Sequence, residues 1–547
     1  MNGFYDDPED VIADGVAGIA AARPDITWES DGFLHFTGEA DGDGRGEGRV
    51  AVISGGGSGH EPMHAGFLGS GMLDAVCPGH VFTSPNTRQL LAATRAVDRG
   101  AGVVHVVKNY TGDVMNFGAA AKLAGEEGID VATVTVADDA ATSDGGIGGR
   151  GTAATILVEK VAGAAAARGD SLADVARIAQ DVADRSATIA VSLSGCRIPG
   201  AEASFELGEG ELEFGVGIHG ERGVRRLDHP GSVRRIVDAL LDRLLPAAGD
   251  PRRVLLLVNG LGGTPELEVS AAFAVTARAL DERGVDIARV VHGEFVTAWD
   301  MTGFSITVLG LDDGADDILD LLDEPTTAPA WEPPTAYADC PDVTLTGAED
   351  LPDGDDPDGP GHRRLSAWVS RVLDSVDDLT ELDRTAGDGD FGVNMRAALA
   401  PLASPLRGTA AGVLDAIGQS YLVRAGGTSG AVFGLFFATM ARNLEDAGEL
   451  EAETLAPAVR AGLDAIVDLG GAKVGDCTVV DAIDPAVRAL EDGGGLAGAA
   501  RAAAEGTEAT AGTAAGKGRA SYVGDAAKGV VDPGALVMSW FFEELAG

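Results

Sequence analysis

Residues 51–66, AVISGGGSGHEPMHAG, join an apolar run to a glycine cluster and two histidines. The run at 50–53 is typical of a buried strand, and glycines after such a strand let backbone N–H groups approach a phosphate. No Lys-Ser/Thr pair follows, so the segment is not a P-loop, and Pro62 occupies the last glycine position of a G-x-G-x-x-G counted from Gly57. The segment therefore predicts a strand and glycine loop of an α/β sheet that presents an imidazole instead of a phosphate cradle.

The sequence around this segment alternates β-rich runs with alanine-rich stretches up to about residue 320. The runs are VAVIS at 50–54, VVHVV at 103–107, VATVTV at 131–136, VLLLV at 254–258 and FSITVLGL at 304–311. Stretches such as 151–168, GTAATILVEKVAGAAAAR, are typical of helices between strands. This alternation predicts an α/β domain over residues 1–322 with a largely parallel sheet.

The remaining sequence changes character twice. Residues 323–362 are rich in Pro, Asp and Gly without a sustained period, which predicts an extended, charged linker. From residue 363 the apolar positions follow a helical period, as at Leu365, Trp368 and Val372. Residues 363–547 are therefore predicted to form an all-α domain, with a glycine loop between most helices.

Length and charge exclude several classes of protein. A chain of 547 residues exceeds the roughly 250–300 residues of one core, so several domains are expected. No apolar run approaches the ~20 residues of a membrane span, and the acidic N-terminus does not resemble a signal peptide, so we expect a cytoplasmic protein. The net charge of −46 argues against nucleic acid or an anionic membrane as a partner. We interpret it as halophilic adaptation to concentrated salt; an acidic protein of ordinary cytoplasm is the alternative.

Polar groups follow predicted strands at three places in the first domain. His60 lies in the opening segment, Lys108 and Asp113 lie in HVVKNYTGDVMNF, and His219 lies between glycines in LEFGVGIHGERG. Ligands of open α/β sheets bind at the carboxyl ends of strands. These side chains therefore predict a pocket for a small polar molecule with acid/base groups. Ordinary surface histidines are the alternative.

The second domain contains a carboxylate cluster and glycine-rich loops. Asp383, Asp388 and Asp390 in ELDRTAGDGDFGVNM suggest Mg²⁺ ligation, with helix capping as the alternative. The loop GGTSG at 426–430 precedes an apolar helix, which favours phosphate binding. Together these features predict a nucleoside triphosphate site on a helical scaffold.

The chain closely resembles the single-chain dihydroxyacetone kinases, in which a K-type substrate domain is fused to an L-type nucleotide domain. The motifs SGGGSGHEPMH, CPGHVFTSP, KNYTGD, GVGIHGE and DMTGFSIT are similar to the K-type set. The motifs ELDRTAGDGDFG, GGTSG, GDCTVVDA, GKGRASYVG and DPGA are similar to the L-type set. The resemblance implies an α/β K-type domain followed by an all-α L-type domain, an antiparallel eight-helix barrel with ATP at one end.

The resemblance also implies roles for individual residues. His219 would hold the ketone as a covalent hemiaminal, and His60 and Asp113 would be the acid/base pair. The substrate-binding residues would be Gly57, Ser58, Gly59, His60, Lys108 and Asp113. Asp383, Asp388 and Asp390 would bind two Mg²⁺ ions on the ATP phosphates. The implied nucleotide-binding residues are Phe391, Gly392, Asn394, Gly427, Thr428, Ser429, Gly430, Gly475, Arg519, Asp532, Pro533 and Gly534. Many relatives have histidine or cysteine where this chain has Phe391, so we expect a backbone contact there.

The function implied is phosphorylation of dihydroxyacetone to its phosphate with MgATP. The alternatives are a kinase for erythrulose or glyceraldehyde, cyclisation of FAD, and a non-enzymatic ketose-binding regulatory or carrier protein. Relatives are homodimers, so we expect a homodimer in which the linker permits one subunit's L-type domain to serve the other's K-type domain.

Overall fold

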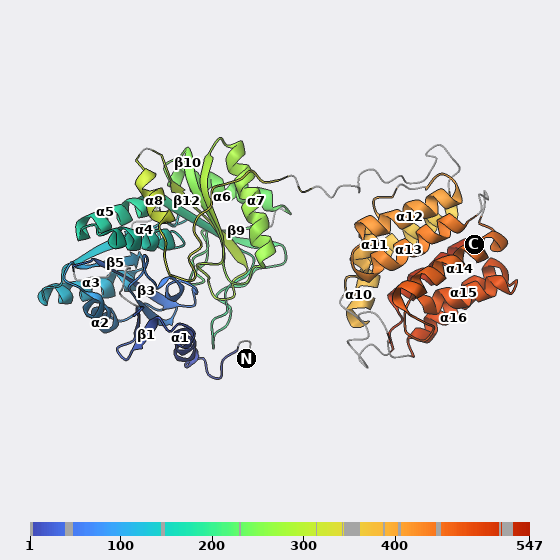
Figure 1. Ribbon diagram of the computed structural model, residues 1–547, viewed down its shortest axis with the longest axis horizontal. Helices are drawn as coiled ribbons and strands as arrows, with labels where there is room; N and C mark the ends of the chain where they lie inside the picture. Colours follow the sequence, from blue (N-terminus) through green and yellow to red (C-terminus); the bar gives the residue numbers. More distant parts are fainter. Residues whose placement is uncertain are drawn as a thin grey trace. The chain divides into compact units, whose positions relative to one another are not determined.

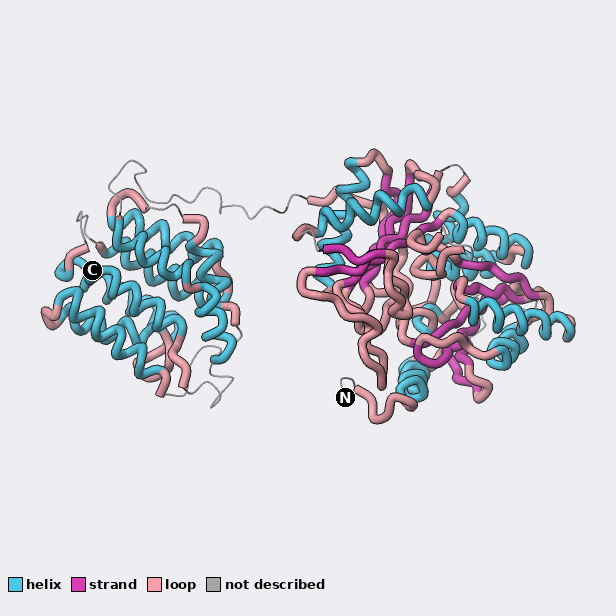
Figure 2. Tube along the Cα trace, turned by 180° about the vertical axis from the view of Figure 1, so that it is seen from behind, coloured by secondary structure: helices cyan, strands magenta, loops and turns pink. Residues whose placement is uncertain are grey.

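The computed structural model describes residues 4–38, 48–143, 148–228, 231–312, 314–341, 343, 362–386, 389–402, 406–444, 450–512, 516 and 529–547. The chain divides into two compact units, Met1–Pro341 and Asp342–Gly547 (Figure 1). The first unit contains strands and helices, whereas the described part of the second contains helices only (Figure 2). This arrangement confirms the predicted α/β domain followed by an all-α domain.

The first unit contains two six-stranded sheets, ordered β1-β2-β4-β3-β5-β6 and β11-β10-β12-β7-β8-β9. The strands are β1 Ile26–Glu29, β2 Phe33–Phe36, β3 Ala51–Ser58, β4 Ala75–Val81, β5 Val103–Lys108, β6 Val131–Val136, β7 Ser186–Ser192, β8 Glu211–Phe214, β9 Arg225–Asp228, β10 Arg253–Gly260, β11 Asp286–Gly293 and β12 Gly303–Gly310. The helices are α1 Val11–Ala22, α2 Thr87–Val97, α3 Thr111–Glu126, α4 Thr155–Arg168, α5 Leu172–Asp184, α6 Val233–Ala247, α7 Glu266–Glu282 and α8 Asp316–Asp323, with the 3₁₀ turn η1 Ala65–Phe67.

The expectation of one largely parallel sheet is wrong for this unit. In the first sheet β3, β4, β5 and β6 pair in parallel, whereas β1 and β2 join antiparallel at the edge. In the second sheet the β10–β11 pair is parallel and the other pairs are antiparallel. The five β-rich runs were located correctly. The direction of pairing could not be predicted, because an apolar run does not indicate whether the neighbouring strand is parallel or antiparallel.

The glycines of the opening segment lie inside β3 rather than in a loop after it. Gly55, Gly56 and Gly57 pair with residues 77–79 of β4. A Cβ on Gly55 would lie 2.6 Å from the Cys77 carbonyl oxygen, and one on Gly57 would lie 2.6 Å from the Thr83 nitrogen. The glycines therefore let the chain after β4 lie directly against β3, which fixes where His60 emerges.

Helix α4 joins the two sheets into one body. Its residues 155–166 are all buried; most are apolar, and the charged Glu159 and Lys160 bond to His64 and to the Leu321 carbonyl. The apolar residues of α4 share one hydrophobic core with Val52 of the first sheet and Leu255 of the second. Functional groups at the ends of either sheet are therefore held by a common core.

The first part of the expected linker is folded against the first unit. Trp331 is 6% exposed within the same core, and Lys160 lies over its ring at 5.9 Å. Thr335 bridges to Val290 of β11. The first unit consequently extends to Pro341 rather than ending at residue 322, because a Pro-rich composition does not exclude a packed strap. Most of 342–361 lies outside the described residues.

The described part of the second unit consists of nine helical segments arranged in succession. They are α9 Arg363–Asp374, α10 Val376–Ala386, α11 Phe391–Leu399, α12 Ala410–Arg424, α13 Gly427–Asn443, α14 Ala452–Gly470, α15 Val479–Glu491, α16 Gly495–Thr510 and α17 Pro533–Ala546. The first and last pack together, since Trp368 Nε1 donates to the Val537 carbonyl at 3.0 Å. The count exceeds eight because α9 and α10 are separated only by Ser375.

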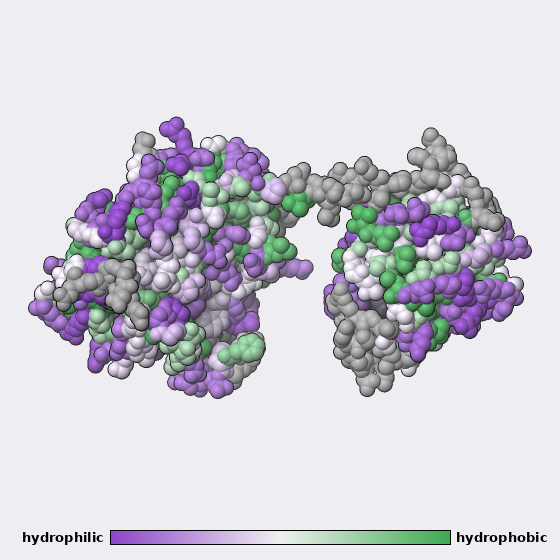
Figure 3. Space-filling view, viewed as in Figure 1, coloured by the Kyte–Doolittle hydropathy of each residue, from purple (hydrophilic) through white to green (hydrophobic). Residues whose placement is uncertain are grey.

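Hydrophilic residues cover much of the visible surface of both units (Figure 3). This distribution agrees with the excess of Asp and Glu in the sequence. Among the helices formed by the described residues, none has the length and apolar character needed to cross a membrane.

Candidate active site

His60 and His219 come together from different sheets of the first unit. His60 follows β3, and His219 lies in the segment after β8. Their ring centroids are 4.8 Å apart, at an interplanar angle of 75°. The structure thus places in contact two histidines that are separated by more than 150 residues in the sequence.

His60 has one nitrogen engaged and one without a partner. Its Nδ1 donates to the Thr297 carbonyl at 2.8 Å, because a carbonyl oxygen only accepts. Its Nε2 is buried and has no hydrogen-bonding partner among the described residues. Burial, with the neighbouring charges of His219 and Lys108, lowers the pKa of His60 well below its usual value. The side chain is therefore a neutral imidazole with a free lone pair, suited to accept a hydrogen bond or a proton.

Aromatic rings enclose His219. Tyr110 lies against it at 4.4 Å between centroids, and Phe82 lies 5.4 Å away and stacks on His60. The His219 side chain retains 15% of its accessible surface. Phe82 and Gly59 both have a positive φ, of 53° and 103°, and a Cβ on Gly59 would lie 2.8 Å from the Phe82 ring. His219 is therefore held firmly but stays accessible to a small molecule.

Lys108 occupies the end of β5 inside the same region. Its Nζ donates to the Gly55 carbonyl at 3.2 Å and to Nε2 of His64 at 2.5 Å. The Nδ1 of His64 in turn donates to Glu159 Oε1 at 2.6 Å. An ammonium has three donors, so one donor remains for a bound molecule or another acceptor. Gly56 is needed here, since a Cβ would lie 2.3 Å from Lys108 Nζ.

Asp113 lies in the first turn of α3, where the helix dipole favours a carboxylate. It is buried, and its Oδ1 has no hydrogen-bonding partner among the described residues. Its charge raises the pKa values of Lys108 and His64 against the lowering effect of burial. Asp113 therefore belongs to the Lys108 cluster and supplies a second unsatisfied buried acceptor.

The glycine segment itself is less available to a ligand than the sequence suggested. The Ser58 hydroxyl donates to the Gly79 carbonyl at 2.8 Å. The backbone N–H of Gly59 donates to the Glu61 carboxylate at 2.9 Å. The polar groups of this segment are therefore already engaged. The buried side-chain atoms of this region without a hydrogen-bonding partner among the described residues are His60 Nε2, Tyr110 Oη, Asp113 Oδ1 and Glu159 Oε2.

In the second unit, predicted nucleotide residues occupy the first turns of three helices. Phe391, Gly392 and Asn394 begin α11, residues 427–430 begin α13, and Pro533 and Gly534 begin α17. A Cβ on Gly534 would lie 2.8 Å from Val479 of α15 and 3.8 Å from the Phe391 ring, so the starts of α11, α15 and α17 are close together. Converging helix N-termini are a setting that favours phosphate.

Carboxylates gather beside these helix starts. Asp383 Oδ2 accepts from the Phe391 N–H at 3.0 Å, and Asp532 caps α17 by accepting from Ala535 at 2.6 Å. Burial and the nearby charges of Asp481 and Asp383 raise the pKa of Asp532 to about 7. Gly475 is engaged by Asp481 at 2.6 Å. Such crowded carboxylates fit a hard cation.

Two predicted site residues lie outside the described residues: Asp388 and Arg519. Within the described part of the chain, no group of three His, Cys, Asp or Glu side chains is arranged to hold a metal. The assignment of Asp383, Asp388 and Asp390 to Mg²⁺ remains a prediction.

The chain matches two family models, the Dak1 domain over residues 17–330 and the DAK2 domain over residues 385–547. Triokinase/FMN cyclase of Homo sapiens is 38% identical, across 96% of this chain and 95% of the human protein. Dihydroxyacetone kinase 2 of Saccharomyces cerevisiae is 36% identical, across 96% of each chain. This chain belongs to the dihydroxyacetone kinase family. The predicted family membership is confirmed.

Other family members resemble the chain over its whole length. L-erythrulose 1-kinase of Mycolicibacterium smegmatis is 33% identical across 100% of this chain and 99% of its own. The dihydroxyacetone kinase of C. freundii, solved in complex with AMP-PNP and Mg²⁺, matches with a TM-score of 0.64 and 32% identity. That match covers 100% of this chain and 99% of the other.

Sequence reasoning missed residues that surround the predicted site. Tyr110 lies within the motif KNYTGD and Glu221 within GVGIHGE, so the motif signal was present. Arg150 carried no such signal, because it stands in a glycine-rich segment far from either motif.

Proposed function

We propose that the chain is an ATP-dependent kinase that phosphorylates dihydroxyacetone to dihydroxyacetone phosphate, with the ketone held by His219. The observation that carries this proposal is the contact between the rings of His219 and His60, whose buried Nε2 has no hydrogen-bonding partner among the described residues. A small polyhydroxylated ligand would satisfy this acceptor and Asp113 Oδ1, which otherwise remain costly buried polar atoms. The names of the relatives support the same class of substrate.

In the proposed chemistry, Nε2 of His219 attacks the ketone carbon. An N–C bond forms, the C=O π bond breaks, and its electron pair moves to the oxygen, which takes up a proton. The proton comes from solvent and is relayed to that oxygen by His60 Nε2 or Asp113, the proposed acid/base pair. One of the two also accepts the proton of the substrate hydroxyl as the hydroxyl oxygen attacks the γ-phosphorus of ATP. The bond between that phosphorus and the bridging oxygen breaks, and ADP leaves. A carbonyl requirement would separate ketoses from glycerol.

The second unit is proposed to bind MgATP. Asp383 and Asp390, with Asp388, would hold Mg²⁺, and the starts of α11, α13 and α17 would face the phosphates. The place of Asp383 supports this assignment, because its Oδ2 accepts from the Phe391 N–H at the start of α11. The cation would neutralise phosphate charge during transfer.

L-Erythrulose is the second candidate substrate, since a relative that covers the entire chain is an L-erythrulose 1-kinase. The same attack by His219 would capture either ketone. We further propose a homodimer in which the second unit of one subunit serves the first unit of its partner.

Binding of dihydroxyacetone labelled with ¹³C at the carbonyl tests the role of His219. The protein-bound signal should move from the ketone region to the tetrahedral-carbon region. His219→Ala should lose that bound signal and lower kcat/KM at least about a hundredfold, as for other residues whose contact forms with the reacting atoms. The affinity for MgATP should stay unchanged. A His219→Ala variant with wild-type kcat/KM would overturn the assignment.

A further inference from the structure

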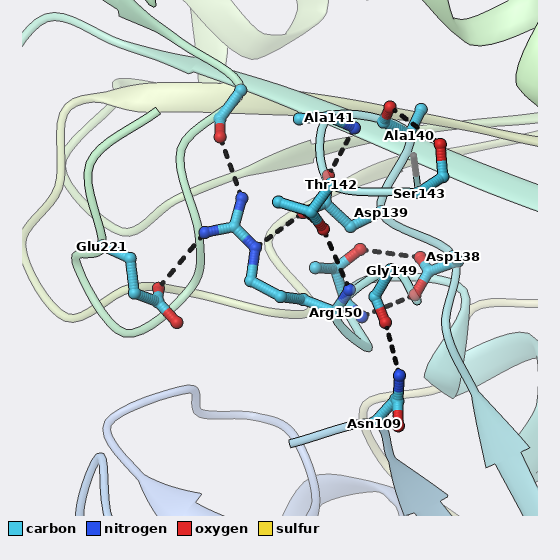
Figure 4. Close-up of polar contacts among 12 residues, drawn as sticks. Asn109, Asp138, Asp139, Ala140, Ala141, Thr142, Ser143, Gly149, Arg150 and Glu221 are labelled. Carbon is cyan, nitrogen blue, oxygen red and sulfur yellow. Dashed lines mark hydrogen bonds and ion pairs between the residues drawn. The ribbon is translucent and has the colours of Figure 1, made fainter. Parts of the chain in front are cut away.

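A chain of ionic contacts outside the predicted site residues ends on His219. Arg150 lies between Asp139 and Glu221 (Figure 4). Its Nε donates to Asp139 Oδ2 at 2.6 Å, and its Nη1 lies 3.9 Å from Glu221 Oε2. Glu221 Oε1 then faces Nδ1 of His219 at 3.3 Å. The chain therefore links a buried carboxylate to the ring of the proposed nucleophile.

The inner end of this chain is anchored. Asp139 has 3% of its side-chain surface exposed and accepts from the Ala141 N–H at 2.9 Å and the Thr142 hydroxyl at 2.8 Å. With both its oxygens engaged, Asp139 cannot turn away from Arg150. Arg150 is thereby fixed as a support for what lies beyond it.

Arg150 also holds the backbone of the segment that carries His219. Its Nη2 donates to the Gly215 carbonyl at 2.9 Å, while Glu221 accepts from the His219 N–H at 3.0 Å. Arg150 thus contacts both ends of the segment 215–221, at the Gly215 carbonyl and at the Glu221 carboxylate. Gly217 makes this possible, because a Cβ there would lie 2.1 Å from Glu221 Oε2 and 2.5 Å from Arg150 Nη1.

The contact to Glu221 selects one tautomer of His219. A carboxylate oxygen only accepts, so Nδ1 carries a proton, and in the neutral ring Nε2 then carries the lone pair. Partial burial raises the pKa of Glu221, but the hydrogen bond from His219 and the charges of His219 and Arg150 outweigh it and bring that pKa to about 2. Glu221 is therefore ionised at any physiological pH.

We propose that Glu221, held in place by Arg150 and Asp139, is a positioning residue: it directs the proton of the neutral His219 ring to Nδ1, which leaves the Nε2 lone pair for the ketone, and it balances the positive charge on the ring when a ketone adds. This proposal rests on the proposed function. When the N–C bond forms and the carbonyl electron pair moves to oxygen, the ring becomes an imidazolium that retains its Nδ1 proton. The Glu221 carboxylate lies beside that charge, and the packed rings of Tyr110 and Phe82 prevent the imidazole from turning.

The test combines affinity with a direct measurement of the tautomer. We expect Glu221→Ala to raise the Kd for dihydroxyacetone about tenfold to a hundredfold, as when a charge-assisted hydrogen bond is lost. The Kd for MgATP should not change. Glu221→Gln keeps an acceptor and should have a smaller effect. Glu282→Ala, which removes an exposed carboxylate paired with Arg234, is the matched control and should bind both ligands normally.

The ¹⁵N spectrum of the His219 ring separates positioning from a loss of structure. The signals of His219 are identified by their absence in the full-length His219→Ala protein. In the wild type, Nδ1 should be the protonated nitrogen; in Glu221→Ala, the proton should move to Nε2 or exchange between both. A wild-type ¹⁵N pattern together with a wild-type Kd in Glu221→Ala would overturn the proposal.

Two further outcomes are distinguishable. If Glu221→Ala does not fold, Arg150→Lys and Glu221→Gln, which nearly preserve side-chain volume, are judged by the same two measurements. If the wild type forms no tetrahedral carbon with ¹³C-labelled ketose, the proposed function fails. The ¹⁵N pattern, which needs no ketose, still decides whether Glu221 sets the tautomer.

Discussion

Buried histidines give the first unit a defined dependence on pH. His105 is buried beside Phe117 and bonds through Nε2 to Thr94 at 3.0 Å, and burial lowers its pKa to about 3. In the unfolded chain this group takes up a proton near its usual value of about 6.5, so its contribution to stability is lost as the pH falls below that value. His60 and His64, whose pKa values are also lowered, act in the same direction.

His105→Gln should therefore reduce the loss of stability in mild acid. Between pH 6.5 and 5.5 the free energy of unfolding should fall by about 1 kcal/mol more in the wild type than in the variant. Urea unfolding followed by tryptophan fluorescence at both pH values measures this. The exposed His80→Gln is the control. Equal slopes in the wild type and His105→Gln would refute the argument.

A substitution at Asp383 should have the opposite effect on ligand binding from His219→Ala: it should weaken MgATP binding and leave ketose binding unchanged. Asp383→Asn keeps an oxygen that can accept from the Phe391 N–H but removes the charge. We expect at least about a tenfold loss of MgATP affinity, the scale of a charge-assisted contact. The ketose should bind as in the wild type. Calorimetric titration with each ligand measures both effects, and unchanged MgATP affinity would contradict the assignment of Asp383.

Among the secondary-structure elements, β3 depends on glycines that cannot be replaced. A Cβ at Gly57 would lie 2.6–2.7 Å from backbone atoms of Phe82 and Thr83, whereas one at Gly18 in α1 would meet nothing within 4 Å. Gly57→Ala should destabilise the first unit by about 1–3 kcal/mol, the cost of overpacking. Gly18→Ala should stabilise it by up to about 1 kcal/mol through helix propensity. Thermal unfolding of both variants tests the pair; equal melting temperatures would show that β3 tolerates a side chain.

The elements also show how far the sequence could be interpreted. Apolar runs located strands such as β5 and β10, because burial on both faces leaves an unbroken apolar signature. Helical periodicity located the second unit. Sheet pairing and the packing of Trp331 depend on residues far away in the sequence, and a single sequence does not show which distant residues pair. His60 and His219 could be nominated from their motifs, but their contact, and the role of Arg150, depend on the tertiary fold.

For the whole molecule, the net charge of −46 predicts a requirement for salt. Self-repulsion destabilises a compact state with so much charge of one sign, and salt screens it over a Debye length of about 10 Å at 0.1 M. The melting temperature should rise as KCl increases from low to molar concentration. Calorimetry measures it, and a melting temperature independent of KCl would contradict the halophilic interpretation.

Mixing variants tests the proposed exchange between subunits. His219→Ala is expected to lack a working ketose site and Asp383→Asn a working nucleotide site. If units pair across subunits, co-expressed variants should recover about a quarter to a half of wild-type activity, depending on how the subunits mix. No recovery from a purified mixed dimer would contradict exchange.

The most direct test of the kinase proposal is a coupled assay of the purified full chain with MgATP in low and high KCl. Dihydroxyacetone, both enantiomers of erythrulose, glyceraldehyde and glycerol are compared side by side. We predict the highest kcat/KM for dihydroxyacetone and none for glycerol, which has no carbonyl for His219 to capture. A higher value for erythrulose would keep the chemistry and change the substrate. Turnover of glycerol, or no turnover of any of these compounds at any salt concentration, would contradict the account.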